Sequence, residues 1–149
     1  MKPLSPVTLA WLLPITILAH QLEEYLMGFP KWYSDLLNAQ LSNSDFLLIN
    51  GIGLFLFTIY AWSYHFNRSN FILLSLGTLV LVNGIIHLGL SVFTWSFSPG
   101  TITGVFLFLP LGVVIFKKIL PLLSQGQQVI AIATGILVLF LVSLIAMNI

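Results

Sequence analysis

Residues 20–24 of the chain read His-Gln-Leu-Glu-Glu and place three ionisable side chains within five positions. In a helix, His20, Glu23 and Glu24 follow the spacing i, i+3 and i+4, which brings them to one face. Imidazole and carboxylate groups at this spacing can bind a metal ion together or pass a proton between them. The segment belongs to a stretch apolar enough to enter a membrane, where each charged group costs about 2.5 to 3.5 kcal/mol. Residues kept at such a cost usually serve a function, so this cluster is the first candidate site.

A second polar pair, Asn83 and His87, is spaced one helical turn apart in a later apolar stretch. At about 1.5 Å per residue, His20 lies about 21 Å and His87 about 24 Å from the cytoplasmic ends of their expected helices. Glu24, Asn83 and Asn50 fall in the same layer, although a hydrogen bond between helices is the simpler explanation for Asn50 alone. The pattern predicts a polar pocket between the first three spanning helices, open toward the outer surface.

Two histidines and a carboxylate are enough to hold zinc or non-haem iron. We therefore expect His20, Glu24 and His87 to bind a divalent metal, either Zn or Fe. The expected catalytic residues are Glu23, as an acid or base, and Asn83, which would orient His87 or the substrate. The expected activity is metal-assisted hydrolysis, isomerisation or oxidation of a lipid-like or other apolar small molecule.

Other interpretations of the same residues stay open. Without a metal, a Glu in a dry pocket and a neighbouring His can carry out acid–base chemistry. A non-enzymatic lipid-binding protein or a proton-coupled transporter could use the same pocket, although the cytoplasmic halves of the spans lack matching polar residues. A buried network that only joins helices is a further alternative, and each such hydrogen bond contributes about 0.6 kcal/mol. Residues 98–101 are interpreted first as a turn, whose hydroxyl groups are also placed to cover the pocket.

The composition identifies the broad class of protein. The chain has 149 residues, of which 58% are hydrophobic and 6% are charged. Because soluble domains carry about a quarter charged residues, this composition predicts an integral membrane protein. There is no cysteine, which excludes disulfides and thiolate metal ligands. The net charge of +1 argues against nucleic acid as a partner.

Five segments are long and apolar enough, or nearly so, to form membrane-spanning helices. They predict an all-α bundle in a single domain over residues 1–149, with spans at about 6–27, 46–64, 71–93, 101–116 and 128–147. The fourth span is short and contains Gly104, Pro110 and Gly112. A bent or half-spanning helix is therefore an alternative at that place.

The connection between the first two spans, residues 29–44, contains Trp32 and Tyr33 beside Lys31. Aromatic residues next to a lysine suit the headgroup layer, so we expect a short interfacial helix there.

The basic residues predict the orientation of the bundle. Four of them fall on one side of a five-span arrangement and Lys31 alone falls on the other; the four are Lys2, Arg68, Lys117 and Lys118. This bias predicts a cytoplasmic N terminus. The brevity and the charge bias favour a prokaryotic inner (plasma) membrane, with membrane lipids as partners. Ala131 and Gly135 form a small-residue face for packing inside the bundle or in a homo-oligomer.

The pentapeptide His20 to Glu24 on a first spanning helix resembles the family of small membrane proteins named for an HXXEE motif. The similarity extends to Phe29-Pro30 with Trp32, to Asn83 with His87, and to the Pro99-Gly100 turn. That family has no assigned activity, so the resemblance implies the site and not a reaction. The chain also resembles sterol isomerase-type membrane proteins in architecture, since they too place His, Glu and Asn within a small helical bundle.

Overall fold

The structure is a computed structural model that describes residues 4–148, so the predicted contribution of Lys2 lies outside the described residues. Within that range every regular element is helical. The elements are α1 (Pro6–Leu26), α2 (Phe29–Leu37), α3 (Asn43–Ser63), α4 (Asn70–Thr94), α5 (Thr101–Thr103), the π-helical segment η1 (Gly104–Phe108), α6 (Leu109–Ile119), the 3₁₀ segment η2 (Leu120–Leu122) and α7 (Gln125–Asn148). The prediction of an all-α fold is confirmed, and α2 is the helix expected within residues 29–44.

Serine side chains begin three of the long helices. Ser5, Ser42 and Ser69 precede α1, α3 and α4 in extended conformation, and each hydroxyl oxygen accepts a backbone N–H three residues later. A serine in this position satisfies an amide that the first helical turn leaves without a partner. The sequence therefore fixes where these helices start.

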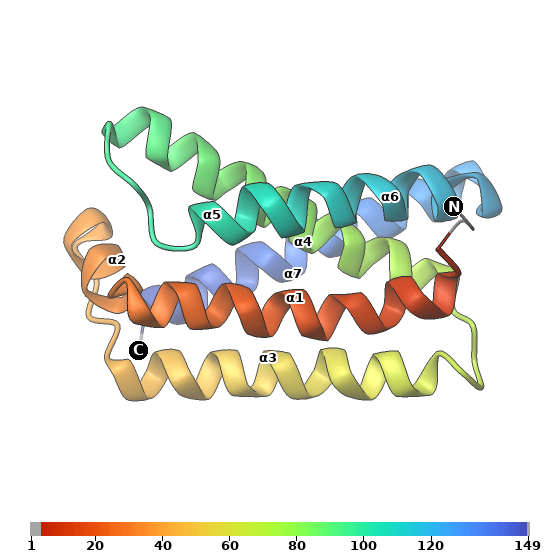
Figure 1. Cartoon of the computed structure of the whole chain (residues 1–149), viewed down its shortest axis with the longest axis horizontal. Helices are drawn as coiled ribbons and strands as arrows, with labels where there is room; N and C mark the ends of the chain where they lie inside the picture. Colours follow the sequence, from red (N-terminus) through yellow and green to blue (C-terminus); the bar gives the residue numbers. More distant parts are fainter. Residues whose placement is uncertain (1–3, 149) are drawn as a thin grey trace.

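The long helices lie side by side as a bundle (Figure 1). Helix α1 runs beside α3, and α4 crosses the bundle and packs against both α6 and α7. The centre is filled by aliphatic side chains of α1, α4 and α6 that have no exposed surface: Leu9, Leu13, Leu73, Leu74, Ile115 and Ile119. This packing holds α1 and α4 at fixed positions relative to each other.

Four helical stretches are long and apolar enough to cross a membrane: α3, α4, Thr101–Leu122 and α7. Many of their outward side chains are large and apolar; Phe55, Phe106 and Val129 are each more than 60% exposed. A surface of this kind suits contact with lipid. Helix α1 has 21 residues but is not among the four, because the polar residues near its end lower its mean hydropathy. The fifth span therefore stays a prediction.

The fourth predicted span is longer than expected. Its helical run continues from Thr101 to Leu122, which is 22 residues rather than an end near residue 116. Near its start, in η1, the N–H of Leu109 donates to the carbonyl of Gly104, so one turn is widened just before Pro110. The helix thus continues through both glycines and the proline, and the alternative of a half-spanning helix at this place is not what the structure has.

Glycine allows close contacts between helices, and two of these contacts bear on the site and on the predicted small-residue face. A Cβ on Gly84 of α4 would lie 2.8 Å from the carbonyl oxygen of Gly104, so α4 and η1 meet backbone to backbone. A Cβ on Gly135 of α7 would lie 2.8 Å from Cβ of Thr78 in α4. Ala131 and Gly135 are both buried, so the predicted small-residue face packs inside the bundle.

Candidate metal centre

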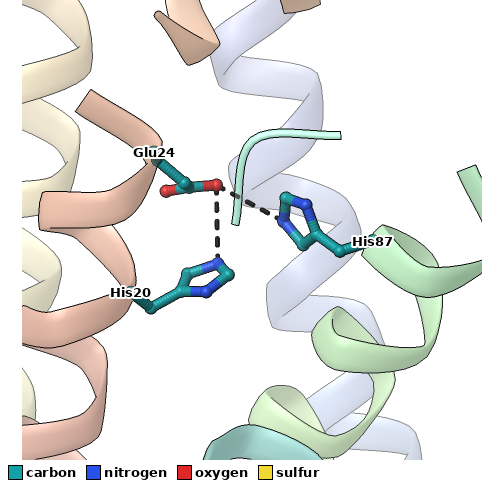
Figure 2. A group of neighbouring side chains, drawn as sticks. All are labelled: His20, Glu24 and His87. Carbon is teal, nitrogen blue, oxygen red and sulfur yellow. Dashed lines mark ion pairs between the residues drawn. The ribbon is translucent and has the colours of Figure 1, made fainter. Parts of the chain in front are cut away.

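Helix α1 and helix α4 bring two imidazoles and one carboxylate together. His20 and Glu24 lie one turn apart near the end of α1, and His87 faces them from α4 (Figure 2). One carboxylate oxygen, Oε1 of Glu24, lies 3.5 Å from Nε2 of His20 and 3.3 Å from Nε2 of His87. The three residues are only 4 to 6% exposed. The predicted convergence of these residues is therefore present in the structure.

Each imidazole is held by a hydroxyl group at its other ring nitrogen. Nδ1 of His20 lies 2.8 Å from Oγ1 of Thr103, and Nδ1 of His87 lies 3.1 Å from Oγ of Ser98. A hydrogen bond at Nδ1 fixes the orientation of the ring and leaves Nε2 for another partner. Both Nε2 atoms point toward Glu24 (Figure 2).

The turn between α4 and α5 covers the cluster. Gly100 has φ +93°, and a Cβ there would lie 2.7 Å from Cε1 of His20, 2.9 Å from Cε1 of His87 and 3.1 Å from Cγ of Glu24. Only glycine combines this left-handed backbone with such close approach. The backbone of Gly100 thus forms the roof over the three side chains.

Hydroxyl groups tie this roof to α4. The Ser91 hydroxyl oxygen accepts the backbone N–H of Ser98 at 2.9 Å and is 2.6 Å from Oγ1 of Thr101. The Thr101 hydroxyl is also 2.6 Å from the carbonyl oxygen of Ser98. Residues 98–101 were predicted to form a turn and to cover the site, and in the structure they form the turn and lie over the cluster.

Glu23 faces away from the cluster, toward the start of the helical run Thr101–Leu122. Its carboxylate accepts the backbone N–H of Ile102 at 3.0 Å, the N–H of Thr103 at 2.7 Å and the Thr103 hydroxyl at 2.5 Å. These amides belong to the first turn of the run Thr101–Leu122, whose N-cap residue, Gly100, has no side chain to accept them. A residue about 80 positions earlier therefore caps this helix.

The donor set fits a metal ion. In tetrahedral zinc sites the nitrogen and oxygen ligands lie about 2.0 to 2.1 Å from the ion, which puts neighbouring ligand atoms about 3.3 Å apart. The two distances from Oε1 of Glu24 agree with that separation, and the ligand atoms of His20, Glu24 and His87 all lie within 4.8 Å of one another. A hydrogen bond between a protonated imidazole and a carboxylate is shorter, about 2.7 to 2.9 Å. Nε2 of His20 is buried and has no hydrogen-bond partner within the described part of the chain.

Two asparagines predicted for this layer do not contact the three donors through any hydrogen bond of the described residues. The Asn50 side chain donates to the carbonyl of Phe46 in its own helix, while its backbone carbonyl accepts the Gln21 amide at 3.0 Å. Oδ1 of Asn83 is buried without a partner in the described range. The site is therefore built by α1, α4 and the roof, and α3 is joined to α1 through Gln21.

The cluster is closed rather than open to the outside. The near-complete burial of its three donors and the position of Gly100 above them leave no exposed face on the cluster. Two hollows lie elsewhere: one of about 430 Å³ beside Arg68 and Tyr64, and one of about 250 Å³ beside Trp11 and Leu54. The predicted outward-opening pocket is thus replaced by a buried centre.

The sequence did not point to Thr103 as a neighbour of the candidate site. Thr103 contacts both His20 and Glu23, although it is distant from them in sequence. Phe108, whose ring centroid lies 4.3 Å from that of His20, is a second such neighbour. The comparison of depths in the membrane covered ionisable and amide side chains; the hydroxyl groups at the start of the fourth span are the signal that points to Thr103.

The chain was compared with curated proteins, with solved structures and with protein families. No match was found among curated proteins, and none among solved structures. Residues 11–115 match the family described as "Protein of unknown function with HXXEE motif", and this region contains His20, Glu23, Glu24 and His87. Because the match covers well over half of the chain, this protein belongs to the HXXEE family.

Proposed function

We propose that this protein is an integral membrane protein that holds one divalent metal ion with Nε2 of His20, Nε2 of His87 and the carboxylate of Glu24. One observation carries the proposal: three metal-binding atoms from two helices converge in a buried cluster at separations of 3.3 and 3.5 Å. Zinc and iron both accept two imidazoles with one carboxylate.

The burial of the cluster supports a cation at its centre. Two unprotonated imidazole nitrogens and a carboxylate oxygen that face one another present lone pairs to lone pairs, which is unfavourable away from water. A divalent ion among them satisfies all three. Together with the charge of Glu24 and that of nearby Glu23, such an ion leaves the region neutral.

Catalysis is the chemistry that we propose for this centre. Three protein ligands leave one coordination position free, and a bound ion would polarise an oxygen placed there. The buried Oδ1 of Asn83 has no partner among the described residues, which supports the proposal that Asn83 orients His87 or a bound substrate. Because apolar side chains surround the bundle, we propose a lipid-like or other apolar small molecule as the substrate.

We further propose that α1 is a fifth span and that the chain starts at the cytoplasmic side of a prokaryotic plasma membrane. At about 1.5 Å per residue, α1 is long enough to cross a hydrocarbon layer of about 30 Å. The Lys118 ammonium group hydrogen-bonds the carbonyl of Leu4, so a basic residue and the start of the chain share one end. Lys31 lies with Asp35 in α2, after the opposite end of α1.

Metal content tests the proposal. Protein purified in detergent is loaded with zinc, freed of excess ion and compared with His20→Ala and His87→Ala by elemental analysis. We expect one zinc per chain in the unchanged protein and almost none in the two variants. His65→Ala is the control, because this exposed histidine accepts the Trp11 indole N–H and is distant from the cluster in sequence.

Zinc that is retained equally by all three variants, or that fails to bind the unchanged protein, would overturn the proposal. Helix content measured by circular dichroism on the same samples identifies a variant that has lost its fold.

A further inference from the structure

The Thr103 hydroxyl joins Glu23 to His20 and determines which ring nitrogen carries the proton. Its Oγ1 is 2.5 Å from Oε2 of Glu23 and 2.8 Å from Nδ1 of His20. An ionised carboxylate only accepts hydrogen bonds, so the hydroxyl proton must point to Glu23. The hydroxyl oxygen then accepts from His20, which requires a proton on Nδ1.

This direction leaves Nε2 of His20 without a proton. A neutral imidazole carries one N–H, so the lone pair lies on Nε2, 3.5 Å from the Glu24 carboxylate. It agrees with the absence of a hydrogen-bond partner for the buried Nε2 in the described part of the chain. An unprotonated Nε2 is the form that binds a metal.

The second histidine follows the same pattern. The Ser98 hydroxyl is 3.1 Å from Nδ1 of His87 and 3.4 Å from the carbonyl oxygen of Pro99. When its proton points to Pro99, the hydroxyl oxygen accepts from Nδ1, and Nε2 of His87 is also left unprotonated. In that arrangement two separate hydroxyl groups hold the two imidazoles in the same way.

We propose that Thr103 and Glu23 are positioning residues that hold His20 as the Nδ1–H tautomer with Nε2 directed to the metal. The role of this tautomer in metal binding rests on the proposed function, whereas the position of the proton follows from the hydrogen bonds alone. Glu23 holds Thr103 in place, because the same carboxylate also accepts the two first-turn amides of the helix that contains Thr103. The second acidic residue of the motif is thus the ligand, and the first sets the proton on the histidine.

The tautomer can be measured without any metal. Nitrogen-15 spectra of zinc-free, histidine-labelled protein in micelles distinguish a protonated ring nitrogen from an unprotonated one. We expect His20 to be protonated at Nδ1 in the unchanged protein and in Thr103→Ser, which keeps the hydroxyl. In Thr103→Val the two tautomers should both be populated. Thr58→Val is the control, since the Thr58 hydroxyl donates to a carbonyl of its own helix.

Glu23→Gln provides a second variant in case Thr103→Val does not fold. A glutamine side chain has one acceptor oxygen and an NH2 group that only donates, so the two first-turn amides and the Thr103 hydroxyl compete for a single acceptor and the hydroxyl proton is no longer committed to position 23. The Nδ1–H tautomer of His20 should lose population in this variant as well. A His20 ring protonated at Nε2 in the unchanged protein, or a tautomer that none of these variants changes, would overturn the positioning role.

Zinc affinity then separates this proposal from the function on which it depends. Loss of an outer hydrogen-bond partner typically weakens metal binding 10- to 100-fold. We expect a loss of about that size in Thr103→Val and near-normal affinity in Thr103→Ser. If the unchanged protein has the expected tautomer but binds no zinc, the proposed function fails while the tautomer assignment holds. If zinc binds with equal affinity in both variants, the metal site stands and the positioning role fails.

Discussion

The five residues of the HXXEE segment point in several directions, because each helical residue turns about 100° from the last. His20 and Glu24 face His87 in α4, Gln21 donates to the carbonyl of Asn50 in α3, and Glu23 accepts from the first turn of the run Thr101–Leu122. Leu22 faces outward and is 52% exposed. One pentapeptide thus connects α1 to three other parts of the bundle.

Helical spacing was sufficient to predict that His20 and Glu24 lie together, and their matching depth in the membrane was sufficient to add His87. The spacing could not assign Glu23 correctly. At i+3 from His20 it was expected on the same face, but the amides of Ile102 and Thr103 draw its carboxylate to the side. Those donors become available only when the fourth span folds against α1, which the local sequence does not encode.

At the residue scale we predict that Glu24→Gln abolishes zinc binding and preserves the fold. The amide has nearly the shape of the carboxylate, but it carries no charge and is a poor metal ligand. Zinc affinity should fall by more than the roughly 10- to 100-fold typical of an outer partner. Competition with a chelator measures the affinity, and circular dichroism checks the fold. Affinity within a few-fold of the unchanged protein would exclude Glu24 as a ligand.

Among the elements, the turn before α5 has the most direct effect on the site. Gly100→Ala places a Cβ 2.7 to 3.1 Å from atoms of all three donors and strains a backbone with φ +93°. We predict a loss of unfolding free energy of about 1 to 3 kcal/mol, as for overpacking in a core, together with weaker zinc binding. Thermal unfolding and zinc titration measure the two effects.

Gly28→Ala is the matched control for Gly100→Ala. Gly28 has φ +73°, and a Cβ there meets nothing within 4 Å, so this variant carries the backbone strain without the overlap. Zinc binding should be weakened only at position 100. Equal zinc affinity in the two variants would show that Gly100 does not cover the centre.

The packing of α4 against η1 depends on Gly84. Gly84→Ala brings a Cβ to 2.8 Å from the carbonyl oxygen of Gly104 and should push the two helices apart. Gly89→Ala in the same helix meets nothing within 4 Å and should be neutral or stabilise the helix by up to about 1 kcal/mol. We therefore predict a lower midpoint of thermal unfolding for Gly84→Ala alone. Similar midpoints in both variants would contradict the backbone contact.

The elements were predictable where apolar length and caps define them. The four candidate spans follow from runs of hydrophobic residues, and serine side chains cap the starts of α1, α3 and α4. The fourth span was predicted to end near residue 116, just before Lys117 and Lys118, whereas the helical run continues to Leu122. Pro110, which usually interrupts a helix, follows the widened turn at η1, where Gly104 lies against Gly84.

For the whole molecule, the testable property is its orientation in the membrane. The chain has no cysteine, so single cysteines can be introduced without background. Asn67 and Ser96 are exposed and lie beyond opposite ends of α4. We predict that a membrane-impermeant maleimide labels Ser96→Cys in intact cells and labels Asn67→Cys only after permeabilisation. The reverse pattern would invert the orientation, and labelling of both from outside would show that α4 does not span.

At this scale the composition predicted a helical membrane protein, and the charge bias predicted which ends share a side. Neither the composition nor the charge bias could predict which helices enclose the site. The first three spans were expected to do so, yet the roof is the turn between the third and fourth spans, and Thr103 belongs to the fourth. Helix α3 reaches the HXXEE segment through the Asn50 carbonyl, which accepts the Gln21 amide. Helix order around a bundle depends on the summed packing of all faces, which no single segment reveals.

The central claim is that two imidazoles and one carboxylate bind the same metal ion, and X-ray absorption at the zinc edge tests it most directly. For the zinc-loaded protein we predict a first shell of nitrogen and oxygen atoms at about 2.0 to 2.1 Å, with the outer-shell signal of two imidazole rings. The signal should fall to one ring in any zinc that His87→Ala retains. A spectrum without imidazole, or one that is unchanged in His87→Ala, would contradict the account.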